Sequence, residues 1–301
     1  MMEQPMGQPM GQSPAGAGAR IVDRGYQRYS GIRLGVTHNV AVMVAAGMQR
    51  GLGLRRPAHA KLLPWLFISI TYLMTLVALA VVVLSGGEVA GDGATYLRLF
   101  SIATIFFVLF AGLSAPDLLC ADRRQRVLSL YFTAPIRRLH YVGAQVLAQM
   151  GLLLLLTLGP WLLLFIGNTL LAPSAWGYLS HHSHDLWHLV VGGLLAALYY
   201  SALALMTAAF SDRRPYASGI FLGLMLISTI VSNVISQVMN FNGHEWFALL
   251  DLANLPAQVM NWLFGAAIVA PLSGGYYLLV TLGVTALSLG VLAWRYLRGD
   301  D

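Results

Sequence analysis

The sequence predicts an all-α integral membrane protein with six transmembrane helices. Of its 301 residues, 57% are hydrophobic and only 10% are charged, and the mean hydropathy is +0.69. Soluble domains carry about 25% charged residues, so a chain this apolar cannot cover its surface with polar groups in water. Its apolar runs recur from Leu62 almost to the C-terminus. Lipid is therefore the expected solvent for most of its surface.

Six stretches are long and apolar enough to span a bilayer, which takes about 20 residues for about 30 Å of hydrocarbon. Arg98, near the start of the second stretch, can extend its guanidinium to the headgroups. The fifth stretch is rich in Ser and Asn but contains no charged residue. The predicted spans are residues 62–84, 97–116, 144–171, 188–210, 217–239 and 273–294.

The basic residues indicate how these spans are oriented. Eight precede the first span, five lie between the second and third, two lie between the fourth and fifth, and two follow the sixth. Only Arg98 belongs to the opposite side. Because cytoplasmic connections carry an excess of Lys and Arg, we expect both termini to be cytoplasmic. The net charge of +6 is then explained by topology and anionic lipid, without nucleic acid.

The chain divides into three regions. Residues 1–19 are rich in Gly, Pro and Gln, which predicts a disordered tail. Residues 20–61 form a cytoplasmic, elbow-like segment, in which residues 31–56 fit an interfacial helix along the cytoplasmic leaflet; a helix without lipid contact is the alternative. Residues 62–301 form the six-span transmembrane domain.

The connection between the second and third spans is long, basic and interrupted by Pro135. A proline disfavours helical geometry in the residue before it, which predicts two short helices with a break at Ala134. One interpretation of this loop is a basic anchor that sets the topology. The order of its residues favours another: Asp122-Arg123, then Leu128 and Leu130, then Ala134-Pro135-Ile136-Arg137-Arg138, then Gly143.

This order resembles the first cytoplasmic loop of the ABC-2 type permeases, the membrane subunits of many ABC exporters. The match departs from the family pattern at Asp122, where Glu is usual, at Arg126-Val127, and at Ala144-Gln145 after Gly143. The resemblance implies a cytoplasmic coupling helix that contacts a separate ATPase. The implied ATPase-coupling residues are Asp122, Arg123, Arg124, Leu128, Leu130, Phe132, Pro135, Arg137 and Arg138.

Residues 240–272, between the fifth and sixth spans, are too apolar for an exposed loop. Pro256 divides them into two pieces of re-entrant or interfacial length, and Trp246 and Trp262 suit the headgroup zone. The ABC-2 family has paired short helices at this place. The alternative is one further span, which would put the C-terminus outside.

Several absences narrow the mechanism. The only lysine is Lys61, between Ala60 and Leu62, so the chain lacks the Gly-Lys-Ser/Thr of a phosphate-binding loop. The six span cores contain no Asp, Glu or Lys, whereas ion-coupled carriers usually keep such residues in the bilayer. Four histidines lie just before the fourth span and at its first residue, but there is no H-E-x-x-H. We favour a polar loop over a metal site at His184 and His188.

The favoured interpretation is therefore a non-enzymatic permease subunit of an ATP-driven ABC exporter that moves a hydrophobic or amphipathic cargo outward. ATP and Mg²⁺ would bind the partner ATPase, and no cofactor is expected in this chain. A second permease subunit, identical or homologous, and membrane lipid complete the expected partners. The use of Arg in place of nearly all Lys indicates a GC-rich bacterial genome, and therefore a bacterial inner membrane. The rival is a non-ABC membrane protein, either a secondary carrier or an assembly factor.

Uncharged polar residues within the spans are candidates for a substrate path, with hydrogen bonding between helices as the alternative role. The candidates are Asn168, Ser232, Asn233 and Gln237.

Overall fold

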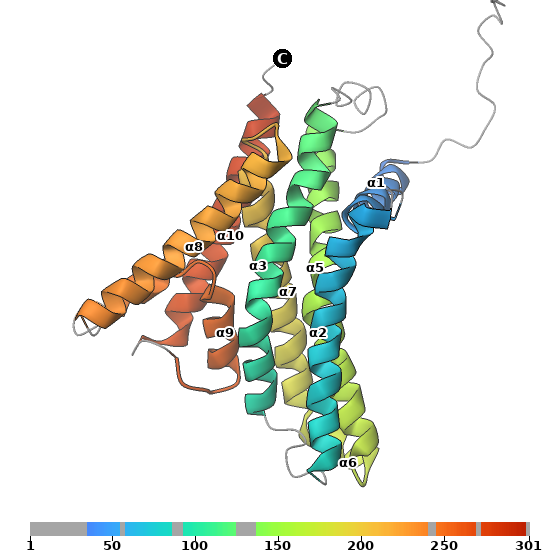
Figure 1. Ribbon diagram of the computed structural model, residues 1–301, viewed down its shortest axis with the longest axis vertical. Coiled ribbons are helices and arrows are strands. Elements are labelled where there is room, and N and C mark those ends of the chain that lie inside the picture. Colours follow the sequence, from blue (N-terminus) through green and yellow to red (C-terminus); the bar gives the residue numbers. More distant parts are fainter. Residues whose placement is uncertain are drawn as a thin grey trace, which may run out of the picture. The chain divides into compact units, whose positions relative to one another are not determined.

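The computed structural model describes residues 35–54, 58–85, 93–124, 137–239, 245–268 and 272–298, and within them the chain is helical and contains no strand. Six helices are long and apolar enough to cross a membrane (Figure 1). The protein is therefore an all-α, multi-pass membrane protein, as its sequence predicts. The six helices are α2 (Ala58–Leu84), α3 (Gly93–Arg124), α5 (Arg138–Leu171), α7 (Ser183–Ala208), α8 (Arg214–Met239) and α10 (Gly274–Arg298).

Two of these helices extend well beyond the apolar stretches that predict them. α3 continues through Pro116 to Arg124, and α5 begins at Arg138 instead of Ala144. An internal proline is tolerated in a membrane helix because neighbouring groups satisfy the carbonyl that it leaves free. As a result, the ends of α3 and α5 that face residues 125–136 are polar and basic.

The core of the bundle is built around α7, which contacts α3, α5, α8, α9 and α10. Its buried face includes Gly192, Gly193, Ala196 and Ala197, and such small residues let neighbouring helices approach closely. In the most apolar stretch of each helix, 67% of the residues of α7 are buried inside the protein, against 22% of those of α2 and 17% of those of α8. α2 and α8 therefore present most of their surface to lipid or to another subunit.

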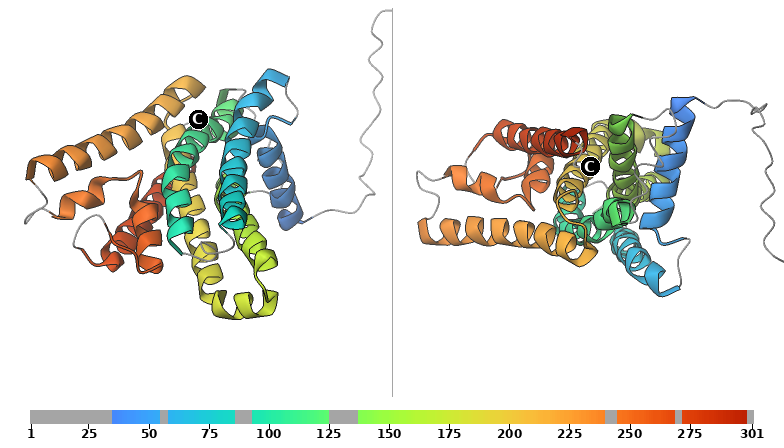
Figure 2. Two further views of the ribbon diagram at one scale, coloured as in Figure 1. Left: turned by 60° about the horizontal axis from the view of Figure 1, so that its bottom comes forward. Right: turned by 90° about the horizontal axis from the view of Figure 1, so that it is seen from above.

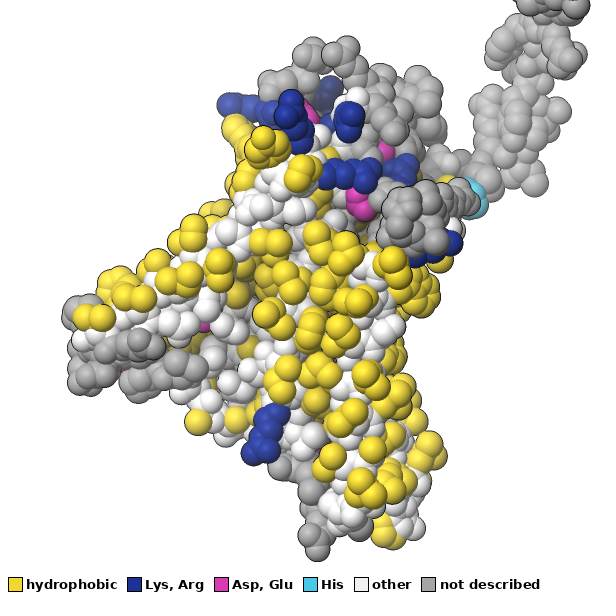
Figure 3. Space-filling view, viewed as in Figure 1, with side chains coloured by type: hydrophobic (Ala, Val, Ile, Leu, Met, Phe, Trp, Pro, Cys, Tyr) yellow, Lys and Arg dark blue, Asp and Glu magenta, His cyan; other side chains and the backbone are white. Residues whose placement is uncertain are grey.

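Basic side chains gather at one end of the bundle, and hydrophobic side chains cover its middle (Figure 3). We call this the basic end; it is where α3, α7 and α10 end and where α5 and α8 begin. Arg98 lies near the start of α3, away from the basic end. This is the charge asymmetry that the sequence predicts for the two faces of a membrane protein.

Shorter helices complete the fold. α1 (Val36–Gly51) lies against α5 and α3, and its Gly47 permits close approach: a Cβ there would lie 2.7 Å from the Cβ of Ala148. α6 (Ala175–His181) was not predicted; it begins where Ser174 accepts a hydrogen bond from the Gly177 amide. Residues 1–34, with the predicted tail and the first part of the elbow-like segment, lie outside the described residues.

The segment between α8 and α10 contains the 3₁₀ helix η1 (Glu245–Leu250) and α9 (Leu255–Leu263). Pro256 stands in the first turn of α9, where its missing N–H is not needed. η1 contacts α8, and α9 contacts α7 and α10. Seen from the basic end, η1 and α9 lie between α8 and α10, and α1 and α2 lie on the other side of the bundle (Figure 2).

Candidate functional site

Asp122 lies near the end of α3 and connects it to two other helices. Its side chain is only 2% exposed. One carboxylate oxygen accepts a hydrogen bond from Arg50 Nη1 at 2.6 Å, and the other accepts one from the Tyr141 hydroxyl at 3.0 Å. Because Arg50 belongs to the last turn of α1 and Tyr141 to the first turn of α5, this carboxylate joins α1, α3 and α5.

The neighbouring residue, Arg123, connects α3 to the turn between α7 and α8. Its guanidinium donates to the carbonyl oxygen of Ala209 and lies 3.3 Å from the carboxylate of Asp212. One turn earlier in α3, the Cys120 thiol donates to the carbonyl oxygen of Ser211 at 3.1 Å. The end of α3 is therefore bonded to three successive parts of this turn.

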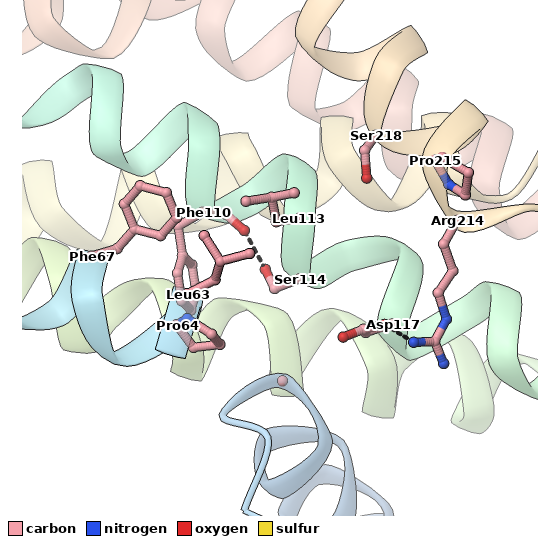
Figure 4. Close-up of a pocket in the computed structure, with 11 residues that line it drawn as sticks. Leu63, Pro64, Phe67, Phe110, Leu113, Ser114, Asp117, Arg214, Pro215 and Ser218 are labelled. Atoms are coloured by element: carbon pink, nitrogen blue, oxygen red, sulfur yellow. Dashed lines mark hydrogen bonds and ion pairs between the residues drawn. The ribbon is translucent and has the colours of Figure 1, made fainter. Parts of the chain in front are cut away.

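Arg214, the first residue of α8, forms an ion pair of 2.6 Å with Asp117 of α3. The pair borders a cavity of about 340 Å³ between α2, α3 and α8, whose wall includes Phe67 and Ser114 (Figure 4). Ser114 accepts a hydrogen bond from Gln149 of α5 at 2.7 Å. This cavity therefore has a charged rim at the basic end and a largely apolar wall with two uncharged polar side chains, Ser114 and Ser218.

Arg138 begins α5 and reaches the last turn of α10, where its guanidinium donates to the carbonyl oxygens of Tyr296 at 3.3 Å and Leu297 at 3.4 Å. A cation at the carboxyl end of a helix satisfies carbonyl groups that have no partner within the helix and interacts favourably with the helix dipole. These contacts gather around the end of α3 and the start of α5, and we call the side chains that make them the basic junction: Arg50, Asp117, Asp122, Arg123, Arg138, Asp212 and Arg214.

The structure separates the predicted coupling residues into two groups. Asp122, Arg123 and Arg138 bond within the chain as part of the basic junction, whereas Arg124 and Arg137 are exposed. Of the predicted coupling residues that the structure describes, this exposed pair makes none of these side-chain contacts and is open to a partner. The remaining predicted coupling residues lie outside the described part of the chain: Leu128, Leu130, Phe132 and Pro135.

The predicted substrate-path residues do not converge on one site. Asn168 is buried near the end of α5 and donates to the Tyr96 hydroxyl of α3 at 3.3 Å, away from the basic end. Ser232 is buried in α8 and Asn233 is exposed beside it. α8 makes its main contacts with α3, η1 and α7. The side chain of Gln237 lies outside the described set.

Sequence analysis missed one acidic residue that enters the bundle. Asp251, between η1 and α9, accepts a hydrogen bond from the Thr229 hydroxyl of α8 at 2.7 Å. On the other side of the same turn, Tyr199 and Tyr200 of α7 donate to the carbonyl oxygens of Leu252 and Ala253. Thr229 and both tyrosines lie at least two helical turns from either end of their helices. A carboxyl group is therefore placed beside the interior of two candidate spans.

The sequence did contain a signal for this acid. Asp251 is one of two acidic residues, with Glu245, in an apolar segment that was itself predicted to enter or line the membrane. Asp251 lies outside the six span cores, so the lack of Asp, Glu and Lys in those cores does not extend to this position. The carbonyl partners of the two tyrosines could not be found from sequence, because every residue has a carbonyl group.

The histidines around the start of α7 are arranged by contacts with each other and with Asp185. His182 Nδ1 lies 2.7 Å from the Asp185 carboxylate, and the rings of His184 and His188 are 4.1 Å apart between centroids. In the part of the chain that the structure describes, no group of three or more His, Cys, Asp or Glu residues is arranged to hold a metal ion.

In comparisons with known proteins, no family model matches the chain and no curated protein sequence matches it.

Proposed function

We propose that this chain is the membrane subunit of an ATP-driven exporter of the ABC-2 type, which moves a hydrophobic or amphipathic cargo outward. The supporting observation is the basic junction. It joins both helices that flank residues 125–136 to α1, to the α7–α8 turn and to α10. A partner that presses on residues 125–136 would therefore displace these elements together.

Such a connection suits a subunit that receives mechanical work from another protein. Coupling between distant sites is carried by packed elements and polar networks that move as units. In this proposal residues 125–136 form the coupling helix, Arg124 and Arg137 pair with acids on the ATPase, and the basic junction passes the motion on. ATP and Mg²⁺ stay on the ATPase, because this sequence has no phosphate-binding loop.

The same proposal predicts the orientation of the bundle in the membrane. The basic end faces the cytoplasm of a bacterial cell, with both termini on that side of the inner membrane. α1 lies along the cytoplasmic leaflet, and η1 and α9 form a re-entrant pair between the fifth and sixth spans. A second permease subunit, identical or homologous, would cover part of the exposed α2 and α8 surfaces.

A direct test is the composition of the assembly. The chain would be purified in mild detergent from its native membrane, and the mass of the complex would be measured. We expect two permease subunits with two ATPase subunits. Leu130→Ala with Phe132→Ala should reduce the bound ATPase, because buried apolar anchors usually carry interface energy.

The contrary result is equally clear. If residues 125–136 were only a basic anchor that sets the topology, only changes to their charged residues would reduce export. Those changes would act by disturbing membrane insertion. If the doubly substituted chain inserts normally, keeps its ATPase and exports cargo at the wild-type rate, residues 125–136 do not couple the two subunits. Substitution of Leu170→Ala with Leu171→Ala, at the exposed far end of α5, is the matched control and should change neither property.

A gradient-driven carrier is a second candidate, and Asp251 favours it, because ionisable groups beside a span interior are the usual coupling device of such proteins. The two candidates differ in energy source. In vesicles with ATP and the ATPase subunit, collapse of the proton and sodium gradients should leave export largely intact if the first candidate is correct. Export that stops with the gradients and needs no ATPase would establish the second.

A further inference from the structure

Asp251 is held by neutral donors. Thr229 Oγ1 donates to one carboxyl oxygen at 2.7 Å and Asn254 Nδ2 donates to the other at 2.8 Å. Among the described residues, the ion pairs involve Asp117, Asp122, Asp185 and Asp212, and none involves Asp251. Both oxygens are thus used as acceptors, the role of an ionised carboxylate, and in the described part of the chain no ion pair balances the charge.

A cavity of about 400 Å³ lies next to this carboxylate, between α3, α8 and the turn at residues 251–254. Thr229 and Asn254, the two donors to Asp251, both belong to its wall. Most of the remaining wall is apolar, with Val108, Met225 and Leu226 among its residues. The cavity therefore offers an apolar volume with one polar side, and the negative charge lies directly behind that side.

The polar side of the cavity presents acceptors. The hydroxyl proton of Thr229 is donated to Asp251, and that of Thr104, also in the wall, is donated to the Phe100 carbonyl oxygen at 2.9 Å. These two hydroxyls therefore offer only lone pairs to an occupant, whereas the exposed hydroxyl of Ser101, also in the wall, can accept or donate. Asn254 offers its amide oxygen as an acceptor, since its amino group is bonded to Asp251. An occupant that donates hydrogen bonds and carries positive charge fits this wall; an anion does not.

The cavity opens on the lipid-facing surface of the bundle. Ile105 of α3 and Leu226 of α8 both line it and are 60% and 62% exposed. The two helices diverge with distance from the basic end (Figure 1). An occupant can therefore enter sideways from the hydrocarbon with its apolar part between Ile105 and Leu226.

From this geometry we infer that the cavity between α3, α8 and residues 251–254 binds an amphipathic organic cation, an apolar body bearing a protonated amine, with Asp251 as its counter-charge. The identification of this occupant as cargo rests on the proposed function. The selectivity of the cavity for a cation does not rest on the proposed function, because it can be measured on the chain without an ATPase.

The test uses dansylcadaverine, a fluorescent apolar ring system with a terminal ammonium, and its N-acetylated derivative, which lacks the charge. The purified chain is placed in nanodiscs of phosphatidylcholine, and saturable binding is measured after subtraction of binding to empty discs. We expect the wild-type chain to bind the ammonium probe about tenfold or more tightly than the acetylated one, the effect of one hydrogen bond to a charged group.

Two variants and a control locate the effect. Asp251→Asn should remove the preference for the ammonium and leave binding of the acetylated probe unchanged. Leu226→Trp, at an exposed position of the wall, should abolish saturable binding of both probes by filling the cavity. Asp185→Asn removes an acid in the first turn of α7 that belongs neither to the cavity wall nor to the basic junction, and should change neither affinity.

Equal binding of the two probes to the wild-type chain would overturn the inference and would indicate an apolar crevice for lipid chains. This comparison needs no variant, so it remains decisive if Asp251→Asn does not fold. The absence of saturable binding, or an unchanged preference in a folded Asp251→Asn chain, would overturn it as well. None of these results bears on the ATPase partner, whose presence is tested separately by the mass of the assembly.

Discussion

At the scale of single residues, Asp122 is the position where one substitution should do most to loosen the basic end. Asp122→Asn keeps the side-chain volume but removes the charge that faces Arg50 at 2.6 Å. We expect a loss of about 1–3 kcal/mol in the free energy of unfolding, because the charge-assisted hydrogen bond between the partly exposed Arg50 and the buried carboxylate of Asp122 is replaced by a weaker neutral one. The free energy of unfolding is measured by titrating the purified chain in detergent with denaturant.

A double-substitution cycle shows whether the loss comes from the pair. Arg50→Gln combined with Asp122→Asn should cost clearly less than the sum of the single changes, since residues in contact are not additive. Tyr141→Phe removes only the second hydrogen bond of Asp122 and should cost about 0.5–1.5 kcal/mol. If the two single changes add without coupling, Asp122 and Arg50 do not form a stabilising pair.

Asp122 could be selected from the sequence, but its partner could not. The acid–basic order around Asp122 pointed to the residue itself, whereas Arg50 lies 72 positions away among several arginines of the same region. Choosing between them requires the path of α1 across α5. For Asp251, the acidic side chain in an apolar segment can be recognised from the sequence. Its position beside Thr229 of α8 follows only from the fold.

At the scale of elements, α1 is held against α5 by close approach at glycine. A Cβ on Gly47 would lie 2.7 Å from the Cβ of Ala148, an atom that cannot move without its backbone. Gly47→Leu should therefore push α1 away from α5, at a cost of about 1–3 kcal/mol for overpacking. Faster hydrogen exchange of the amides in α1 would report this displacement.

Gly143→Leu is the matched control, because nothing lies within 4 Å of a Cβ at that position of α5. Both changes replace glycine by a better helix former, so the difference between them isolates packing. Unchanged exchange in α1 for Gly47→Leu, equal to that of Gly143→Leu, would mean that α1 does not depend on this contact.

The long helices could be predicted because their signal is length and apolarity, which need no knowledge of neighbours. The ends of α3 and α5 could not, since they are polar and are ordered by contacts such as Arg123 with Ala209 and Arg138 with α10. α6 was missed for a similar reason: it is seven residues long and is set by the Ser174 cap. Short elements with weak apolar patterns depend on their surroundings.

At the scale of the whole molecule, the alternation of the six helices places the start of α7 and the α7–α8 turn on opposite sides of the bilayer. The basic end contains the turn, so positive charge predicts that this side is cytoplasmic. In a Cys120→Ser background, we expect a cysteine at Ser183, which is exposed at the start of α7, to react with an impermeant maleimide on intact cells.

A cysteine at Arg213, exposed in the α7–α8 turn, should react only after the membrane is permeabilised, because α7 carries the chain across the hydrocarbon between the two positions. Position 299 should behave like position 213 if the segment with η1 and α9 returns to the side that it entered from. Asp251 makes this result informative for mechanism. Reaction at position 299 from outside would mean a further crossing between α8 and α10, with the carboxylate inside a full span. Protection there, together with reaction at Ser183, would leave Asp251 at the tip of a re-entrant turn, where an amphipathic cation can reach it from the lipid.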